Sequence, residues 1–162
     1  MGYDPYDYYD LGEIDRKGGK ATWFGSKADL LDLIKTAHDH GMQVYADMIF
    51  NHNSGGDAQE PNPIDSKMRW TRFQPESGQF LRDWSYFHPS LYEQWDGAMF
   101  GEMPDLCHRN PLVYTELIKY AKWMLENIEF DGFRYDMVKG MAAGWSVPSR
   151  NYAPRMTERS LS

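Results

Sequence analysis

Residues 47–52 (DMIFNH) and 132–140 (GFRYDMVKG) decide the fold of this 162-residue chain. The first segment closes the apolar run 42–50 (MQVYADMIF), and the second overlaps the apolar run 130–138 (FDGFRYDMV). Short apolar runs that follow a helix are typical of parallel strands covered on both faces. We therefore expect two parallel strands, each ending in polar and charged side chains.

A helical pattern precedes each predicted strand. Residues 27–40 follow Ser26, which can cap a helix together with Asp29 three residues later. The apolar residues of one face of this helix are Leu30, Leu33, Ile34 and Ala37. Residues 111–128 follow Asn110, a second capping residue type, with proline at the first helical position. The apolar stripe of this helix is Val113, Leu117, Tyr120, Ala121 and Met124.

The stretch between the first strand and the second helix has a different character. Residues 53–105 contain turn signals such as NSGGD, EPNP and WDG, and they show no clear periodicity. About fifty residues are too many for a plain loop in a compact domain, so we expect a small irregular subdomain inserted here. The order loop, helix, strand, insertion, helix, strand predicts a parallel α/β architecture.

The polar residues at the two strand ends are candidates for chemistry. Alternate side chains of a strand share a face, which groups Asp47 with Asn51 and Arg134 with Asp136. The carboxyl ends of barrel strands line the active site in α/β barrels. Charged groups on both otherwise apolar strands are therefore predicted to point into one cleft, together with His52.

The composition excludes some classes of partner. The chain carries 17 Lys and Arg against 24 Asp and Glu, a formal net charge of −7. Nucleic acids and anionic lipids bind basic surfaces, so we expect neither as the partner. Aromatic residues make up 15% of the chain, which fits either a large core or the stacking of sugar rings on aromatic side chains.

Cysteine chemistry is limited in this chain. Cys107 is the single cysteine, so no intramolecular disulfide forms. Cys107 and His108 are two candidate ligands for a soft metal, which is fewer than a zinc site requires, and we expect a structural role for the pair.

Four motifs in order resemble those of the α-amylase family of glycoside hydrolases. DMIFNH is similar to its signature Asp-x-x-x-Asn-His, and GFRYDMVKG is similar to Gly-Phe-Arg-x-Asp-x-x-Lys. Residues 103–111 (MPDLCHRNP) and 2–13 (GYDPYDYYDLGE) also resemble family segments. The resemblance implies part of a (β/α)8 TIM barrel, around strands 2–4, with an inserted irregular B domain.

The resemblance also divides the chain into four parts. It implies a barrel segment with strand 3 over residues 1–52 and a B-domain-like insertion over residues 53–110. A second barrel segment with strand 4 would cover residues 111–140, and residues 141–162 form an atypical tail.

Roles for six site residues follow from the resemblance. Asp136 would be the catalytic nucleophile of a retaining mechanism, and Arg134 would hold that carboxylate ionised and oriented. The substrate-binding residues implied are Tyr3, His52, Lys139 and Asp47. Tyr3 would stack under a sugar, and His52 would hydrogen-bond a sugar hydroxyl. Lys139 would contact the sugar on the reducing side, and Asp47 would support the site by hydrogen bonding.

A calcium ion is implied as the cofactor. The ligands carried over by the resemblance are the side chains of Asn51, Asp96 and Asp105 and the carbonyl groups of Gly140 and Ala98. Oxygen ligands from several segments suit Ca2+. The family signature often ends in Lys-His, whereas this chain has Lys139 followed by Gly140, which removes an imidazole but keeps the carbonyl.

The predicted substrate is a starch-like α-glucan, cleaved at internal α-1,4 bonds. A complete barrel needs about 250 residues, and the acid/base Glu motif of the family is not found here, so we expect a fragment that is inactive alone. Transglycosylase or debranching activity of the same family, a non-catalytic glucan-binding role and an unstable fragment are the alternatives. The resemblance suggests an extracellular location, and the sequence does not determine the oligomeric state.

Overall fold

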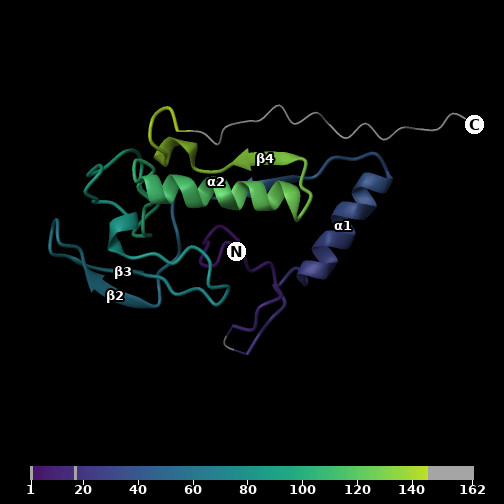
Figure 1. Ribbon diagram of the computed structural model, residues 1–162, viewed down its shortest axis with the longest axis horizontal. Helices are drawn as coiled ribbons and strands as arrows, with labels where there is room; N and C mark the ends of the chain where they lie inside the picture. Colours follow the sequence, from purple (N-terminus) through teal and green to yellow (C-terminus); the bar gives the residue numbers. More distant parts are fainter. Residues whose placement is uncertain (1, 17, 146–162) are drawn as a thin grey trace, which may run out of the picture.

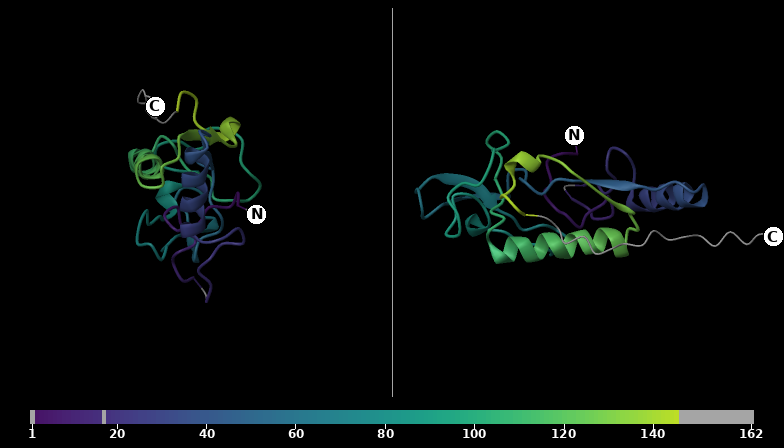
Figure 2. Two further views of the ribbon diagram at one scale, coloured as in Figure 1. Left: turned by 90° about the vertical axis from the view of Figure 1, so that its right-hand side faces the viewer. Right: turned by 90° about the horizontal axis from the view of Figure 1, so that it is seen from above.

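The computed structural model describes residues 2–16 and 18–145, and most of the predicted tail, 146–162, lies outside these residues. The elements in chain order are α1 (Lys27–Asp39), β1 (Tyr45–Met48), β2 (Ala58–Pro61), β3 (Met68–Arg72), η1 (Trp84–Tyr86), α2 (Pro111–Glu126), β4 (Gly132–Tyr135) and η2 (Val138–Gly140). The hairpin of β2 and β3 lies at one end of the molecule and α1 at the other (Figure 1 and Figure 2, right). In the described part of the chain, no helix is long and apolar enough to span a membrane.

The strand pair β1–β4 positions the candidate site. The two strands are parallel, with Asp47 opposite Arg134 and Met48 opposite Tyr135. The Asp136 N–H extends the pairing by donating to the Met48 carbonyl at 3.0 Å. The carboxyl ends of both strands therefore lie side by side, as the sequence predicts for a parallel pair.

Both helices begin where the capping residues predict. Ser26 and Asp29 form a reciprocal capping box at the start of α1. The Asn110 side chain accepts a hydrogen bond from the Leu112 N–H at 2.9 Å, which starts α2 with Pro111 in its first turn. All five residues of the predicted α2 stripe are buried, so this face is confirmed.

The core joins α2 to the N-terminal loop through aromatic rings. The Tyr8 and Tyr120 rings meet edge to face with centroids 4.9 Å apart, and Phe50 packs against Tyr120 at 6.1 Å. Arg82 is buried beside these rings and donates a hydrogen bond to the Tyr6 carbonyl at 2.5 Å. Burial lowers the pKa of Arg82 to about 10. The guanidinium thus ties the N-terminal loop to the insertion.

The β strands are shorter and more exposed than the apolar runs predict. In β1, Ala46 and Met48 are buried while Tyr45 and Asp47 are exposed, so the expected cover on both faces is wrong for the described residues. Leu33 of the predicted α1 face is likewise not covered, because it is 56% exposed in the described structure. The sheet has two strands, and the described part of the chain covers one of its faces.

The insertion is more regular than its sequence indicates. Strands β2 and β3 pair antiparallel, with a register shift between Ala58 and Glu60. Glu60 is buried, and its carboxylate accepts from Thr71 Oγ1 at 3.0 Å and from Arg72 Nη2 at 2.9 Å. A buried carboxylate and a proline at the end of β2 hide this hairpin from patterns of alternating hydrophobicity.

Replacing Leu117 by Ala is expected to lower the free energy of unfolding by about 2–5 kcal/mol, because its side chain is fully buried on α2. Leu112→Ala on the same helix is the matched control, since Leu112 is 55% exposed. The control should change stability by less than about 0.5 kcal/mol. Urea unfolding measures both, and equal losses in the two variants would contradict this placement of α2.

Candidate active site

Arg134 lies between two carboxylates at the ends of β1 and β4. Its Nη1 atom is 2.5 Å from Asp47 Oδ2 and 3.1 Å from Asp136 Oδ1. The bond to Asp47 raises the pKa of Arg134 above its ordinary value. A guanidinium shared in this way pairs with both carboxylates and fixes the direction of each.

Tyr3 extends this group from the N-terminal loop. Its hydroxyl donates to Asp47 Oδ2 at 2.9 Å, and this hydrogen bond raises the pKa of the phenol. The side chain stays 44% exposed, which leaves ring surface open beside the carboxylates. The structure therefore brings together four of the predicted residues: Tyr3, Asp47, Arg134 and Asp136.

His52 is placed differently from the sugar-contacting role that the resemblance implies. The residue is fully buried, and its Nε2 atom lies 3.0 Å from the Tyr3 carbonyl oxygen. One face of the imidazole is covered by the Phe100 ring, with centroids 4.5 Å apart and planes 11° apart. His52 thus braces the loop that carries Tyr3 and has no exposed edge in this conformation.

Lys139 lies in η2, directly after the strand end. Met137 adopts a left-handed conformation with φ of 50°, so the chain leaves the strand direction before Lys139. The Lys139 side chain is exposed, and its carbonyl oxygen accepts from the Ala98 N–H at 3.2 Å. If β4 continued as an extended strand, alternation of its side chains would place Val138 on the same face as Asp136. The left-handed turn at Met137 ends this alternation at Asp136.

The predicted calcium ligands form two groups in the described structure: Asn51, Ala98 and Gly140 lie against one another, whereas Asp96 and Asp105 both approach His88. The Oδ1 atoms of Asn51, Asp96 and Asp105 are buried and have no hydrogen-bond partner. A Cβ atom built on Gly140 would lie 2.0 Å from Asn51 Oδ1 and 2.5 Å from the Ala98 carbonyl oxygen. The orphaned Asn51 Oδ1 and the Ala98 carbonyl oxygen beside Gly140 are oxygen donors of the kind that Ca2+ prefers.

His88 joins these acids, although nothing in its local sequence predicted it. Its Nδ1 atom lies 3.1 Å from Asp105 Oδ2 and 3.7 Å from Asp96 Oδ1. Burial lowers the pKa of His88, but hydrogen bonds with Asp105 and Cys107 and the charge of Asp96 outweigh it and raise the pKa to about 10. Burial also raises the pKa of Asp105. The raised pKa of His88 reflects the acids around it, whereas the raised pKa of Asp105 reflects its burial.

Cys107 and His108 have separate partners. Cys107 Sγ accepts from Ser90 Oγ at 3.0 Å, whereas His108 contacts Asp96 Oδ2 at 3.1 Å and the Phe50 carbonyl oxygen at 3.0 Å. Each side chain therefore joins different parts of the insertion and barrel segment, in line with a structural role.

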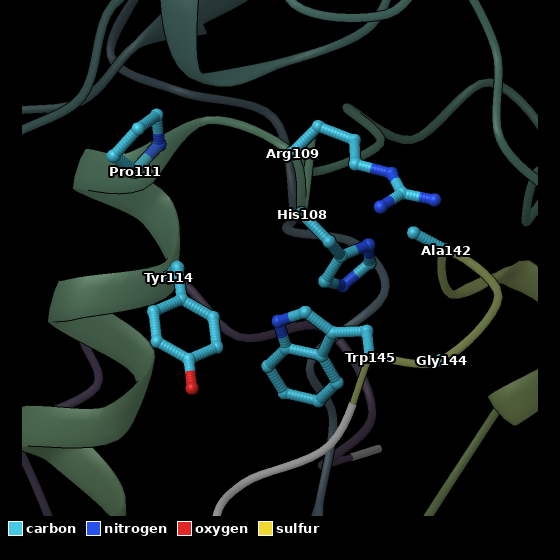
Figure 3. Close-up of a pocket in the computed structure, with 7 residues that line it drawn as sticks. All are labelled: His108, Arg109, Pro111, Tyr114, Ala142, Gly144 and Trp145. Carbon is cyan, nitrogen blue, oxygen red and sulfur yellow. The ribbon is translucent and has the colours of Figure 1, made fainter.

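A surface pocket lies apart from the carboxylates. Figure 3 shows Trp145 beside His108 and facing Tyr114 of α2, with Arg109 at the rim. The His108 and Trp145 ring centroids are 4.9 Å apart, and Trp145 also packs on Phe50. The predicted nucleophile and substrate-binding residues do not line this pocket, so we assign it no role in catalysis.

The fold and the site define part of an α/β enzyme whose charged groups gather at the carboxyl ends of parallel strands. Comparison with known proteins agrees: the family model described as alpha amylase, catalytic domain, matches residues 1–158. An α-amylase from Geobacillus stearothermophilus is 33% identical over 86% of this chain, which spans 33% of that relative. The cytoplasmic α-amylase of Escherichia coli is 29% identical over 88% of the chain and 38% of the relative.

Solved structures give the same result. The α-amylase of Geobacillus thermoleovorans, complexed with acarbose, matches with a TM-score of 0.55 and 28% identity over 86% of this chain and 27% of that one. A gamma-CGTase from Alkalophilic bacillus clarkii has a TM-score of 0.56 at 21% identity, over 86% of this chain and 19% of its own, and supports the fold alone.

This chain belongs to the α-amylase family of glycoside hydrolases, as its motifs predict. Its fold is a partial TIM barrel of that family, and it spans about a third of the length of the curated relatives it matches.

Gly140→Ala tests the close approach of Gly140 and Asn51, two of the predicted metal ligands. The added methyl group would overlap Asn51 Oδ1, so we expect a loss of about 1–3 kcal/mol in unfolding free energy. Gly19→Ala is the control, because a Cβ there meets nothing within 4 Å. Equal stability of the two variants in urea would show that Gly140 does not press against Asn51.

Proposed function

We propose that this chain forms the nucleophile side of an α-amylase-type active site that acts on internal α-1,4 bonds of starch-like glucans. The observation that carries the proposal is Arg134 held between Asp47 and Asp136, with the half-exposed Tyr3 beside them. Family membership adds support, because relatives with α-amylase names match most of the chain.

The geometry suits the first half of a retaining mechanism. Asp136 would attack the anomeric carbon and form a glycosyl ester, while the bond to the leaving oxygen breaks. Arg134 contacts Asp136 Oδ1 at 3.1 Å and limits the rotation of the carboxylate, which favours attack by one defined oxygen. Tyr3 offers ring surface on which the apolar face of a glucose unit can stack.

The described residues do not supply the acid that a retaining mechanism needs at this site. The leaving oxygen needs a proton from a neutral carboxylic acid, and such an acid requires an environment that disfavours its charge. Asp47 is the other carboxylate beside Asp136, but it binds the same guanidinium and the Tyr3 hydroxyl. Asp47 is therefore an orienting group, and the chain alone would bind a glucan without cleaving it.

We also propose that Ca2+ binds at Asn51, Asp96, Asp105 and the carbonyl groups of Ala98 and Gly140. The unpartnered buried oxygens support this assignment. The ion would neutralise buried acids and join the insertion to the strand ends that carry Asp136. The ion would therefore have a structural role, because it would hold the insertion and the strand ends in position.

The 162-residue polypeptide is expected to release no reducing sugar from soluble starch above the level of its Asp136→Asn variant. The same polypeptide should be retarded in native gels that contain soluble starch, because Tyr3 and its neighbours remain. Starch cleavage that Asp136→Asn abolishes would contradict the missing-acid argument. Migration unaffected by starch would contradict glucan binding.

Calcium is expected to raise the midpoint of thermal unfolding and the free energy of unfolding. A free calcium concentration 100 times the dissociation constant would raise the free energy of unfolding by about 2.7 kcal/mol. Asn51→Ala should lose most of this gain, because it removes a buried ligand oxygen. The exposed acid Asp32 provides the control variant Asp32→Asn, which should retain it. A calcium response that survives in Asn51→Ala would place the ion elsewhere.

A further inference from the structure

Phe100 is an aromatic residue beside the active site that the sequence motifs do not include. Its ring lies nearly parallel to the His52 imidazole, with centroids 4.5 Å apart. His52 is fully buried, whereas Phe100 remains 42% exposed. One face of the phenyl ring is therefore used inside the protein, and ring surface remains open to solvent.

The backbone around Phe100 is anchored on both sides. Before it, the Ala98 N–H donates to the Lys139 carbonyl at 3.2 Å, and a Cβ on Gly97 would lie 2.7 Å from that same oxygen. After it, the Asn53 N–H donates to the Pro104 carbonyl at 2.9 Å. The loop is thus tied to the chain that follows both strands, β1 with Asp47 and β4 with Asp136 after it, and it presents Phe100 from a fixed base.

His52 connects Phe100 to Tyr3. The same imidazole that stacks on Phe100 approaches the Tyr3 carbonyl oxygen at 3.0 Å through Nε2. Tyr3 in turn bonds Asp47 through its hydroxyl, beside Arg134. The buried imidazole therefore contacts the Phe100 ring on one side and the backbone of Tyr3 through Nε2, so it links two partly exposed aromatic residues that are far apart in the sequence.

We propose that Phe100 is a second sugar-stacking residue, which holds a glucosyl unit of the α-glucan next to the unit that contacts Tyr3. This inference rests on the proposed function and adds a specificity-determining residue to it. A phenyl ring stacks on the apolar face of a pyranose, and a ring already fixed on His52 loses little conformational entropy when the sugar binds.

A purely hydrophobic cover for His52 is the competing explanation, and it makes a different demand on the side chain. A cover needs apolar bulk, which leucine supplies, whereas sugar stacking needs a flat ring. Phe100→Leu keeps the bulk and removes the ring, and Phe100→Tyr keeps the ring. Phe24, which is 86% exposed on another loop, provides the matched control Phe24→Leu.

The test is the affinity of the 162-residue chain for maltoheptaose, measured by calorimetry, with cellohexaose as the β-linked control sugar. We expect Phe100→Leu to bind maltoheptaose roughly fivefold more weakly, with Phe100→Tyr and Phe24→Leu within about twofold of the parent chain. Thermal unfolding of each variant identifies any general loss of structure. If Phe100→Leu does not fold, Phe100→Tyr still tests whether an aromatic ring at this position supports maltoheptaose binding.

The possible failures are distinguishable. Parent-like affinity in a folded Phe100→Leu variant would overturn the role of Phe100 and leave the proposed function intact. Absence of maltoheptaose binding by a cooperatively folded parent chain would overturn both. Equal binding of cellohexaose and maltoheptaose would also overturn the inference, because the stacking surface would then lack preference for the α-linked sugar.

Discussion

Arg134 lies between the carboxylates of Asp47 and Asp136, and the parallel register of β1 and β4 puts it there. Because Asp47 is directly opposite Arg134, a slip of one residue would move every side chain of one strand to the other face. The loop that carries Tyr3 reaches the same carboxylate. The orientation of the proposed nucleophile thus depends on strand pairing, before any substrate arrives.

A second constraint holds the strand ends to the insertion. Asn51 follows β1 and Gly140 closes η2, while Asp96 and Asp105 come from the insertion. The buried Oδ1 atoms of Asn51, Asp96 and Asp105 have no hydrogen-bond partner, which supports the cation site that we propose there. The same segment carries Phe100, which stacks on His52. Phe100 therefore lies in the same part of the chain as Asp96 and Asp105, so the insertion would carry a proposed sugar-stacking ring as well as proposed metal ligands.

Much of this arrangement was predictable from local patterns. Capping residues and the apolar stripe of α2 predicted the helices, because those signals act within a few residues. The motifs predicted the carboxylate–arginine group, which the strand register brings together. The β2–β3 hairpin, His88 and Phe100 were not predicted, because their partners are distant in the sequence. Exposure of Tyr45 and Leu33 was also missed, since burial depends on what packs against a strand or helix.

The most direct test of the account is covalent trapping of the nucleophile. An activated maltosyl fluoride has a leaving group that needs no protonation, so it bypasses the missing acid. Mass spectrometry of the digested 162-residue chain would identify the modified peptide. We predict a glycosyl adduct on Asp136 that disappears in Asp136→Asn. No adduct on the folded chain, or an adduct that persists in that variant, would contradict the assignment of Asp136 as the preoriented nucleophile.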